Sequence, residues 1–475
     1  MNARLRFFQF LLLIFFAGAP LVIKGQALAI TQTNFPPEPR REQLLNGLRL
    51  LLWSTPNDPN VLIKLRVHSG AAFDLANKEG TMALLSDALF PDPATREYFT
   101  QELGGRLEVA TDYDTLTITM AGRATEFERI VEQLRNALVA TPLTNEAIER
   151  LRTARQQLVS EKSLDSAALA DRAIAARLFN DFPYGRSSAG TPDSLARLTR
   201  GDLLYARERF LNPNNATLVL IGGVDASRAM RAFRQLLGQW RKSETIIPAT
   251  FRQPEAPDAR TLILDVPGAM AAEVRLGVRA LARSDRDAAV ADVLALIVRE
   301  RWQKLTPELT ESNFSVRHEA HMLPGIFIMS ASVKGTDAAK ILLSARNTMQ
   351  ALTSSAPATA AEVARAKDAA LAMLNKRRAT PDGLADLWLD GDTFKLPPLT
   401  DQVKALNDLT AADVERVAAK LFRDASIVAV VVGNAAELRA AIERAGSVQV
   451  LEAKTFDHTS RPAQIVLPAP PHRPN

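Results

Sequence analysis

The stretch at residues 80–90 places three side chains of interest on one face of a helix that is otherwise suited to burial. Its apolar residues recur at i, i+3 and i+4, the pattern of a helix packed against a core. Ala83, Ser86 and Asp87 share the remaining face, because residues three and four apart point the same way. Alanine cannot coordinate a metal, and serine cannot replace a carboxylate as a general base near neutral pH.

The histidines are not spaced as metal ligands on a helix. The chain has five of them, and no two are four residues apart: His68, His318, His321, His458 and His472. His318 and His321 lie in residues 315–333, which we predict to be a strand, where positions i and i+3 point to opposite faces. We therefore expect them at a solvated strand end or turn.

Other catalytic patterns are missing from the sequence. Residues 185–189 approach Gly-x-Ser-x-Gly but lack the final glycine and a preceding buried strand. There is no Gly-rich phosphate loop. The chain has no cysteine, which excludes disulfides, thiolate zinc sites and cysteine nucleophiles.

Residues 1–29 have the layout of a secretory signal peptide. Arg4 and Arg6 form a basic start, residues 7–23 are apolar, and residues 27–29 (Ala-Leu-Ala) fit a cleavage site. We therefore expect a secreted or periplasmic protein. The alternative is an uncleaved membrane anchor, because the apolar run is long. No later stretch of the sequence is apolar enough to span a bilayer.

The net charge of +5 belongs largely to this signal. Without the signal's Arg4, Arg6 and Lys24, 55 basic residues face 53 acidic ones, a net charge of +2. This balance argues against nucleic acid as a partner.

The chain repeats itself at an offset of 211 residues. Leu198-Thr199 recurs as Leu409-Thr410, and the buried strand at 219–222 recurs at 430–433. We infer two homologous α+β domains at residues 38–241 and 259–450. A proline-bearing linker at residues 242–258 separates them, and a Pro-rich tail follows at 451–475.

Periodicity and turn signals place the elements of the first domain. We expect strands at residues 48–53, 61–68 and 216–222, and a strand pair at 106–122. We expect helices at residues 80–90, 92–105, 124–140, 145–163, 165–181 and 225–238.

The order and spacing of several short motifs resemble the insulinase/pitrilysin family of zinc peptidases, which have an inverted-zincin fold. The likeness covers roughly residues 40–445, and these pieces carry it: Asn-Gly-Leu-Arg at 46–49, Gly80, Leu-Gly-Gly at 103–105, Pro-Tyr-Gly at 183–185, Gly-Thr at 190–191 and Pro-Asn-Asn-Ala at 213–216. The resemblance implies two similar domains, each a mainly antiparallel sheet covered by helices. In the family they face each other across a clam-shell chamber.

The family's His-x-x-Glu-His zinc motif falls on Ala83, Ser86 and Asp87 of this chain, so both histidines and the general base are missing. The resemblance places a further glutamate ligand at Glu161, which we expect to point inward on a stripe with Leu158. We expect no zinc. The alternatives are a hard cation held by Asp87 and Glu161, or a Glu161 that simply bonds a neighbour.

Some bacterial relatives work as pairs, in which one chain carries the zinc motif and the other supplies an arginine and a tyrosine. With Arg301 set on the family's Arg-Leu step, those positions fall at Pro307 and Phe314, which cannot donate as arginine and tyrosine do. The family's substrate-pairing edge strand matches the residues Leu107, Glu108, Val109, Ala110 and Thr111. Glu108 stands where the family prefers asparagine.

We therefore expect a peptidase-like protein that is not catalytic on its own, binds peptide, and pairs with an active zinc-bearing homologue. Two alternatives stay open: a zinc endopeptidase with an atypical site, and a stand-alone peptide-binding or envelope scaffold module. Contact with a membrane is expected only if the signal is uncleaved.

Overall fold

The computed structural model describes residues 38–244, 251, 254–310 and 313–456, and the chain from Pro39 onward groups as one unit. The predicted signal peptide and most of the Pro-rich tail lie outside these residues. Within the described residues, no helix combines the length and apolar character needed to cross a membrane.

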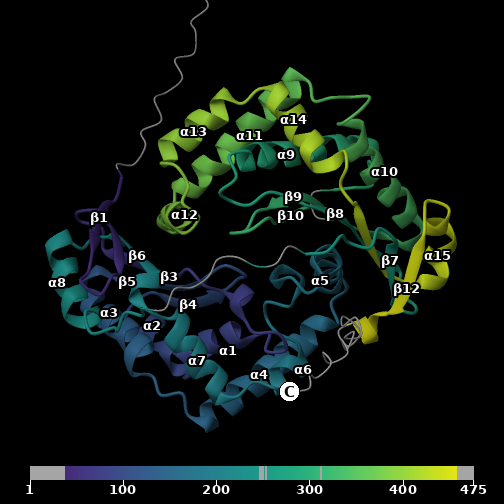
Figure 1. Cartoon of the computed structure of the whole chain (residues 1–475). Coiled ribbons are helices and arrows are strands. Elements are labelled where there is room, and N and C mark those ends of the chain that lie inside the picture. Colours follow the sequence, from purple (N-terminus) through teal and green to yellow (C-terminus); the bar gives the residue numbers. More distant parts are fainter. Residues whose placement is uncertain (1–37, 245–250, 252–253, 311–312, 457–475) are drawn as a thin grey trace, which may run out of the picture. The chain divides into compact units, whose positions relative to one another are not determined.

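The first half of the chain forms a six-stranded sheet. Its strands are β1 (Arg40–Gln43), β2 (Arg49–Ser54), β3 (Asn60–Val67), β4 (Arg106–Thr111), β5 (Leu116–Arg123) and β6 (Ala216–Gly222). Their order is β1-β2-β6-β3-β5-β4 (Figure 1). Only β2 and β6 pair in parallel, and the other neighbours are antiparallel.

Apart from α5, which is described below, the helices of this half pack against the first sheet and share its core. They are α1 (Thr81–Leu89), α2 (Ala94–Gln101), α3 (Phe127–Arg135), α4 (Asn145–Ser163), α5 (Ser166–Phe179), α6 (Pro192–Ala196), α7 (Arg200–Phe210) and α8 (Ala226–Leu237).

The second half repeats this plan. Its strands are β7 (Thr261–Asp265), β8 (Ala271–Arg279), β9 (Phe314–Glu319), β10 (Ile326–Lys334), β11 (Val428–Gly433) and β12 (Val448–Glu452), in the order β12-β7-β11-β8-β10-β9. Its helices are α9 (Ala288–Leu305), α10 (Ala338–Ala351), α11 (Ala360–Arg378), α12 (Pro381–Thr393), α13 (Leu399–Asp408), α14 (Ala411–Phe422) and α15 (Ala435–Glu443).

The internal repeat is visible in matching helix starts. Thr199 caps α7 and Thr410 caps α14, and each forms a reciprocal capping box with an aspartate three residues on, Asp202 or Asp413. The equivalent strands β6 and β11 are both fully buried. The predicted fold class, α+β with two mainly antiparallel sheets covered by helices, is confirmed.

One helix from each half crosses to the other sheet. The apolar side of α5 packs against β8 and β11 of the second sheet, with Ile174 and Leu178 in that cluster (Figure 1). In return, α12 packs against β3 and β6 of the first sheet through Leu384 and Leu389. Trp388 of α12 contacts Trp53 of β2, with ring centroids 5.7 Å apart. Each sheet therefore completes its burial with a helix from the other half.

The polar side of the α12 contact is a row of ion pairs. Lys64 and Arg66 of β3 are buried, and they reach Asp386 at 3.0 Å and Asp390 at 2.7 Å. Because Asp386 and Asp390 are four residues apart on α12, both carboxylates face the strand. The aspartates of α12 thus neutralise the two cations that the packing of this helix buries.

His68 follows β3 and is enclosed by the same contact. Its ring nitrogens lie 3.1 Å from the hydroxyl of Thr393 and 3.0 Å from that of Thr217. The pKa of His68 is lowered from 6.5 to about 3. The largest cause is burial of the ring, and the next is the positive charge of Arg49. The imidazole is therefore neutral over the physiological pH range.

Most elements differ from their predicted bounds by a few residues, and two further differences concern the second sheet. The single strand expected at residues 315–333 is a hairpin, in which β9 and β10 are joined by a turn that holds His321. Gly325 lies at this turn, where an added Cβ would fall 1.9 Å from the carbonyl oxygen of Glu319. The second sheet also continues to Glu452, two residues beyond the predicted domain end, because β12 pairs with β7.

Candidate functional site

Helix α1 begins at a glycine that the backbone requires. Gly80 has φ +89°, and an added Cβ would lie 2.9 Å from the carbonyl oxygen of Ala189. The carboxylate of Asp74 accepts hydrogen bonds from the backbone N–H groups of Gly80 at 2.8 Å and Met82 at 3.0 Å. Burial raises the pKa of Asp74 from 3.8 to about 7. These contacts hold the start of the helix that resembles the family's zinc helix.

The three positions of the zinc motif do lie together on α1. Ala83 and Ser86 are buried, and the hydroxyl of Ser86 donates to the carbonyl oxygen of Ala83 at 2.7 Å. The hydroxyl is thus turned back onto its own helix. Only Asp87 offers a carboxylate, and about a third of its side chain is exposed.

Arg155 of α4 contacts Asp87 with both arms of its guanidinium. Its Nε lies 2.6 Å from one carboxylate oxygen, and a terminal nitrogen lies 2.7 Å from the other. This is the bidentate geometry of a strong charge-assisted pair. The side chain of Arg155 is only 13% exposed. A cation of the chain itself, the Arg155 guanidinium, therefore pairs with the carboxylate that stands at the position of the family's second histidine.

Glu161 lies outside this contact. It is exposed near the end of α4, and its carboxylate accepts a hydrogen bond from Gln157 at 3.0 Å. Leu158, expected on the same inward stripe, is 45% exposed. The buried residues of α4 are Ile148 and Val159 instead, so the expected inward direction of Glu161 is wrong.

The donor set at α1 does not fit zinc. Ala83 has no donor, Ser86 is bonded to its own helix, and both oxygens of Asp87 face a guanidinium. Over the described ranges, no group of three histidine, cysteine, aspartate or glutamate side chains has the geometry to hold a metal ion.

Of the two positions aligned with the family's carbonyl donors, Phe314 is packed in the core and Pro307 is exposed, and the reference residue Arg301 holds neighbouring helices together. Arg301 of α9 is paired with Glu362 of α11 at 2.7 Å and donates to two backbone carbonyls of the α10–α11 loop. Phe314, at the start of β9, is buried against Trp302 with ring centroids 5.8 Å apart. Pro307 lies exposed between them in sequence.

The two histidines of the β9–β10 hairpin have separate surroundings. The Nδ1 atom of His318 lies 2.8 Å from Asp292 of α9, and the side chain is fully enclosed. His321 sits beside Asp114 of the first half, at 3.3 Å from a carboxylate oxygen. The two histidines therefore face different partners. His321 lies at the turn and is partly exposed, but His318 lies within β9 and is enclosed, so the predicted solvated position is wrong for His318.

Strand β4 is at the edge of the first sheet, where the sequence placed the substrate-pairing strand. It pairs with β5 on one side, and no described strand pairs with its other edge. The side chains of Glu108 and Ala110 are exposed, whereas Leu107 is buried. The Oγ1 atom of Thr111 is buried and bonds no other described group.

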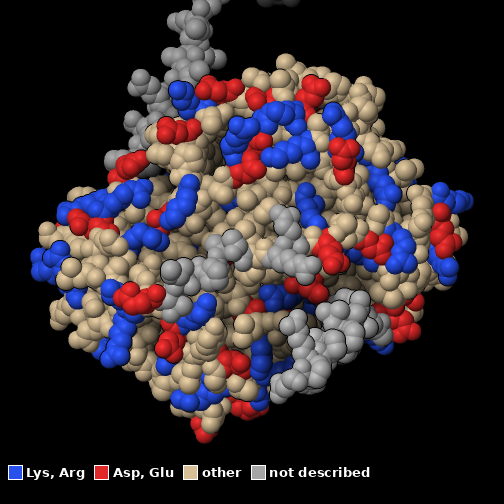
Figure 2. Space-filling model, in the orientation of Figure 1, with Lys and Arg blue, Asp and Glu red and all other residues tan. Residues whose placement is uncertain are grey.

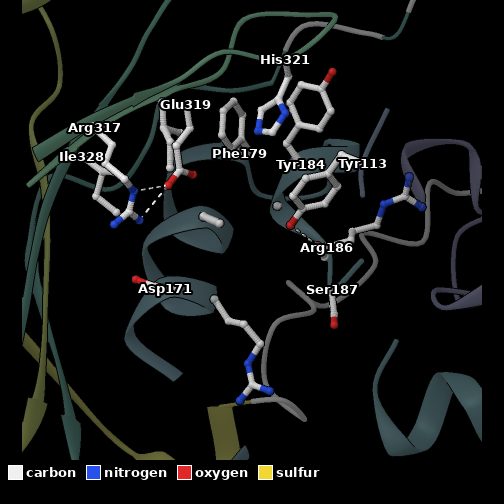
Figure 3. A pocket seen from close by; sticks show the side chains of 14 residues that line it. Tyr113, Asp171, Phe179, Tyr184, Arg186, Ser187, Arg317, Glu319, His321 and Ile328 are labelled. Carbon is white, nitrogen blue, oxygen red and sulfur yellow. Dashed lines mark hydrogen bonds and ion pairs between the residues drawn. The ribbon is translucent and has the colours of Figure 1, made fainter. Parts of the chain in front are cut away.

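A cavity of about 200 Å³ lies away from the predicted site positions, between α5, the turn η4 (Pro183–Gly185) and the β9–β10 hairpin. Figure 3 shows Arg317 beside Glu319 at one end, and Tyr113, Tyr184 and His321 grouped at the other. Arg317 and Glu319 are 2.7 Å apart, and Asp171 is paired with Arg275 of β8 at 2.6 Å. Three of the charged lining residues are thus in ion pairs, and Arg186 donates to the backbone carbonyl oxygens of Asp74 and Ala72.

Beside this cavity a buried polar network joins the two halves of the chain. The hydroxyl of Tyr184 donates to Asp114 at 2.7 Å and accepts from the backbone N–H of Leu323 at 3.0 Å. Asp114 also accepts from the backbone N–H of Met322 at 3.0 Å. We interpret this region as a structural junction. The sequence had no local signal for it, because its members lie far apart in the chain.

Figure 2 shows basic and acidic side chains interspersed over the visible face. This distribution matches the low net charge of the chain without its predicted signal. A mixed surface of this kind produces little long-range electrostatic steering.

Two family models match the chain. The model for the insulinase family (peptidase family M16) matches residues 49–192, and the model for the peptidase M16 inactive domain matches residues 197–370. Together they span the first half and much of the second.

Solved structures share the fold. A protease from Helicobacter pylori is 18% identical, with a TM-score of 0.77 over 83% of this chain and 100% of that one. A peptidase M16 inactive domain from Pseudomonas fluorescens is 16% identical, with a TM-score of 0.74 over 83% and 98%. A chain of complex III2 from Candida albicans is 15% identical, with a TM-score of 0.72 over 86% and 99%. Identities this low establish the fold alone.

The family models, the two similar halves and the order of the short motifs agree. The chain belongs to the insulinase family, peptidase family M16, as a member whose zinc-motif positions hold Ala83, Ser86 and Asp87.

Proposed function

We propose that this chain is a non-catalytic subunit that pairs with an active, zinc-bearing M16 homologue and helps to bind its peptide substrate. The observation that carries the proposal is the pairing of Asp87 with Arg155 where the family places a metal ligand. A peptidase of this family needs a metal-bound water and a carboxylate base, and this helix supplies neither.

Three features support a role as a structural partner. Both halves keep complete, buried cores around their sheets, although the catalytic positions have changed. The inactive-domain model matches residues 197–370, which include much of the second half. The signal-like segment at 1–29 supports secretion or a periplasmic location.

The pairing has a direct test. The chain is co-expressed with a homologue from the same organism that carries His-x-x-Glu-His, and the mixture is analysed by size exclusion with light scattering. We expect one complex with the summed mass at micromolar concentration, since a stable interface buries more than about 1,000 Å². Peptidase activity of the homologue should be at least tenfold higher in the complex. Separate elution with unchanged activity would favour a stand-alone scaffold module instead.

The peptide-binding part of the proposal rests on the outer edge of β4. The backbone N–H of Asp112 donates to the carbonyl oxygen of Thr115, which fixes the hydrogen-bonding phase of the β4–β5 ladder. Because bonded and non-bonded pairs alternate in an antiparallel ladder, the backbone groups of Leu107, Val109 and Thr111 point outward. An extended peptide could add to the sheet there.

Val109→Pro should therefore weaken peptide binding at least tenfold with little effect on the fold. Proline removes the outward N–H, and it is tolerated on an edge strand because no bond to β5 is lost. Binding of fluorescein-labelled casein, an unfolded polypeptide, can be followed by fluorescence polarisation. The control Val109→Thr keeps the N–H and the β-branched shape. Equal binding by the two variants would remove β4 from the proposal.

A further inference from the structure

We propose that Arg155 is a built-in cation that replaces the metal of the family between α1 and α4, and that it keeps this site closed to zinc. The inference rests on the proposed non-catalytic function and adds a role for one residue. Its central observation is the bidentate contact of the Arg155 guanidinium with Asp87, which stands at a metal-ligand position.

The contact has the properties expected of a substitute for a metal. It joins the same two helices that the family's histidine and glutamate ligands would join through zinc. Both carboxylate oxygens of Asp87 are used, at 2.6 and 2.7 Å, so the negative charge is neutralised within the chain. Arg155 is only 13% exposed, so removal of Asp87 would leave a largely buried guanidinium without its counter-charge.

The placement of Arg155 on α4 supports this role. Ile148, Arg155 and Val159 recur at spacings of seven and four, so they lie on one face of the helix, and both apolar residues are buried. Glu161, the residue at the family's glutamate position, is exposed and bonded to Gln157 instead. The helix therefore turns a guanidinium, rather than a carboxylate, toward α1.

A consequence concerns attempts to rebuild the zinc site. The triple substitution Ala83→His, Ser86→Glu and Asp87→His restores the motif, but it removes the carboxylate that neutralises Arg155. The guanidinium would then lie beside the incoming metal, and like charges close together disfavour binding. Adding Arg155→Gln removes the charge and keeps a shorter polar side chain at that position.

The first experiment compares these variants by isothermal titration with Zn²⁺ alone at neutral pH. We expect the quadruple variant to bind at least tenfold more tightly than the triple variant. Equal affinity of the two would overturn the role of Arg155. Circular dichroism spectra of both variants check that each is folded. Each variant carries the same three motif substitutions, so Arg155 is the one difference between them.

The second experiment measures the coupling between Asp87 and Arg155 in a chain that carries no motif substitutions. A cycle of Asp87→Ala, Arg155→Ala and the double substitution is followed by thermal unfolding. Arg155→Ala should lower Tm by about 4 °C or more, and the double variant should lose less than the sum of the single losses. The exposed Lys162 on the same helix is the control, and Lys162→Ala should leave Tm nearly unchanged. Additive losses would show that the two residues are not coupled.

The proposed function can fail separately from this inference. Metal analysis of the unaltered protein after dialysis against trace zinc should find less than 0.1 zinc ions per chain, and addition of a chelator should leave Tm unchanged. One tightly held zinc per chain would end the non-catalytic proposal and would also contradict a site closed to zinc, so the pairing test is the one that separates the two proposals. If the chain does not pair with the homologue but the cycle still shows coupling between Asp87 and Arg155, the proposed function fails and the inference about the built-in cation stands.

Discussion

Replacing Asp386 and Asp390 together by alanine should lower the free energy of unfolding by about 3–5 kcal/mol. The two carboxylates neutralise Lys64 and Arg66, whose side chains are only 7% and 10% exposed beneath α12. Removing one side of a buried ion pair leaves the other charge desolvated and uncompensated. Lys64 would keep Asp382, at 3.2 Å, as a weaker and more exposed partner.

Urea unfolding followed by circular dichroism measures this loss. The matched control is Asp368→Ala, because Asp368 is an exposed aspartate in the middle of the neighbouring helix α11. Adding Lys64→Met and Arg66→Met to the double variant should recover much of the stability, since the stranded charges are then gone. A loss below about 1 kcal/mol, or no recovery, would show that this row of ion pairs contributes little.

The second large effect is a loss of stability in mild acid that depends on His68. Its pKa is about 3 in the folded chain and 6.5 in the unfolded chain, so below pH 6.5 the unfolded state binds the proton first. Stability is therefore fully present above pH 6.5 and falls as the pH drops toward 3. From this group alone, the loss between pH 6.5 and 4.5 should be about 2–3 kcal/mol.

Urea unfolding of the wild type and His68→Gln at pH 8.0, 6.5, 5.5 and 4.5 tests this expectation. Glutamine can still contact Thr217 or Thr393 but does not titrate. The free energy of unfolding of the wild type minus that of His68→Gln should fall by about 2–3 kcal/mol between pH 6.5 and 4.5, because other groups titrate alike in both proteins. Parallel pH profiles would mean that His68 is not held neutral by burial.

Local signals in the sequence predicted the elements of the first half well. The helix at 145–163 and the strand at 216–222 have the predicted bounds, because each combines a clear period with a cap or turn at both ends. The hairpin of β9 and β10 was merged into one strand. Its turn is marked by Pro324-Gly325, a signal that the apolar runs on either side outweighed.

The pairing of the helices with the sheets could not be predicted in this way. A helical apolar stripe shows that a face is buried, but it does not identify the surface that covers it. The aspartates of α12 lie more than 300 residues from Lys64 and Arg66 in the chain. Only the three-dimensional arrangement shows that they neutralise each other.

The candidate site shows the same limit on a smaller scale. The lost zinc motif was readable at Ala83, Ser86 and Asp87, because its spacing is local. The role of Arg155 was missed because α4 carries two apolar stripes one residue position apart, and the stripe with Leu158 was chosen. Ile148 and Val159 mark the stripe that is buried, and Arg155 lies on it. The stripe with Ile148 and Val159 is the one that would bury a charged side chain, and that side chain is Arg155.

The reciprocal exchange of α5 and α12 also constrains how the chain can be made. Synthesis proceeds from the N-terminus, so the apolar face of β3 and β6 emerges long before the helix that covers it. At about 5–20 residues per second, the interval from Gly222 to Thr393 lasts roughly 10–30 s. During that time the nascent first half exposes an unfinished sheet face, and exposed apolar surface of this kind favours aggregation and chaperone binding. Neither half can reach its final state until nearly the whole chain has been produced.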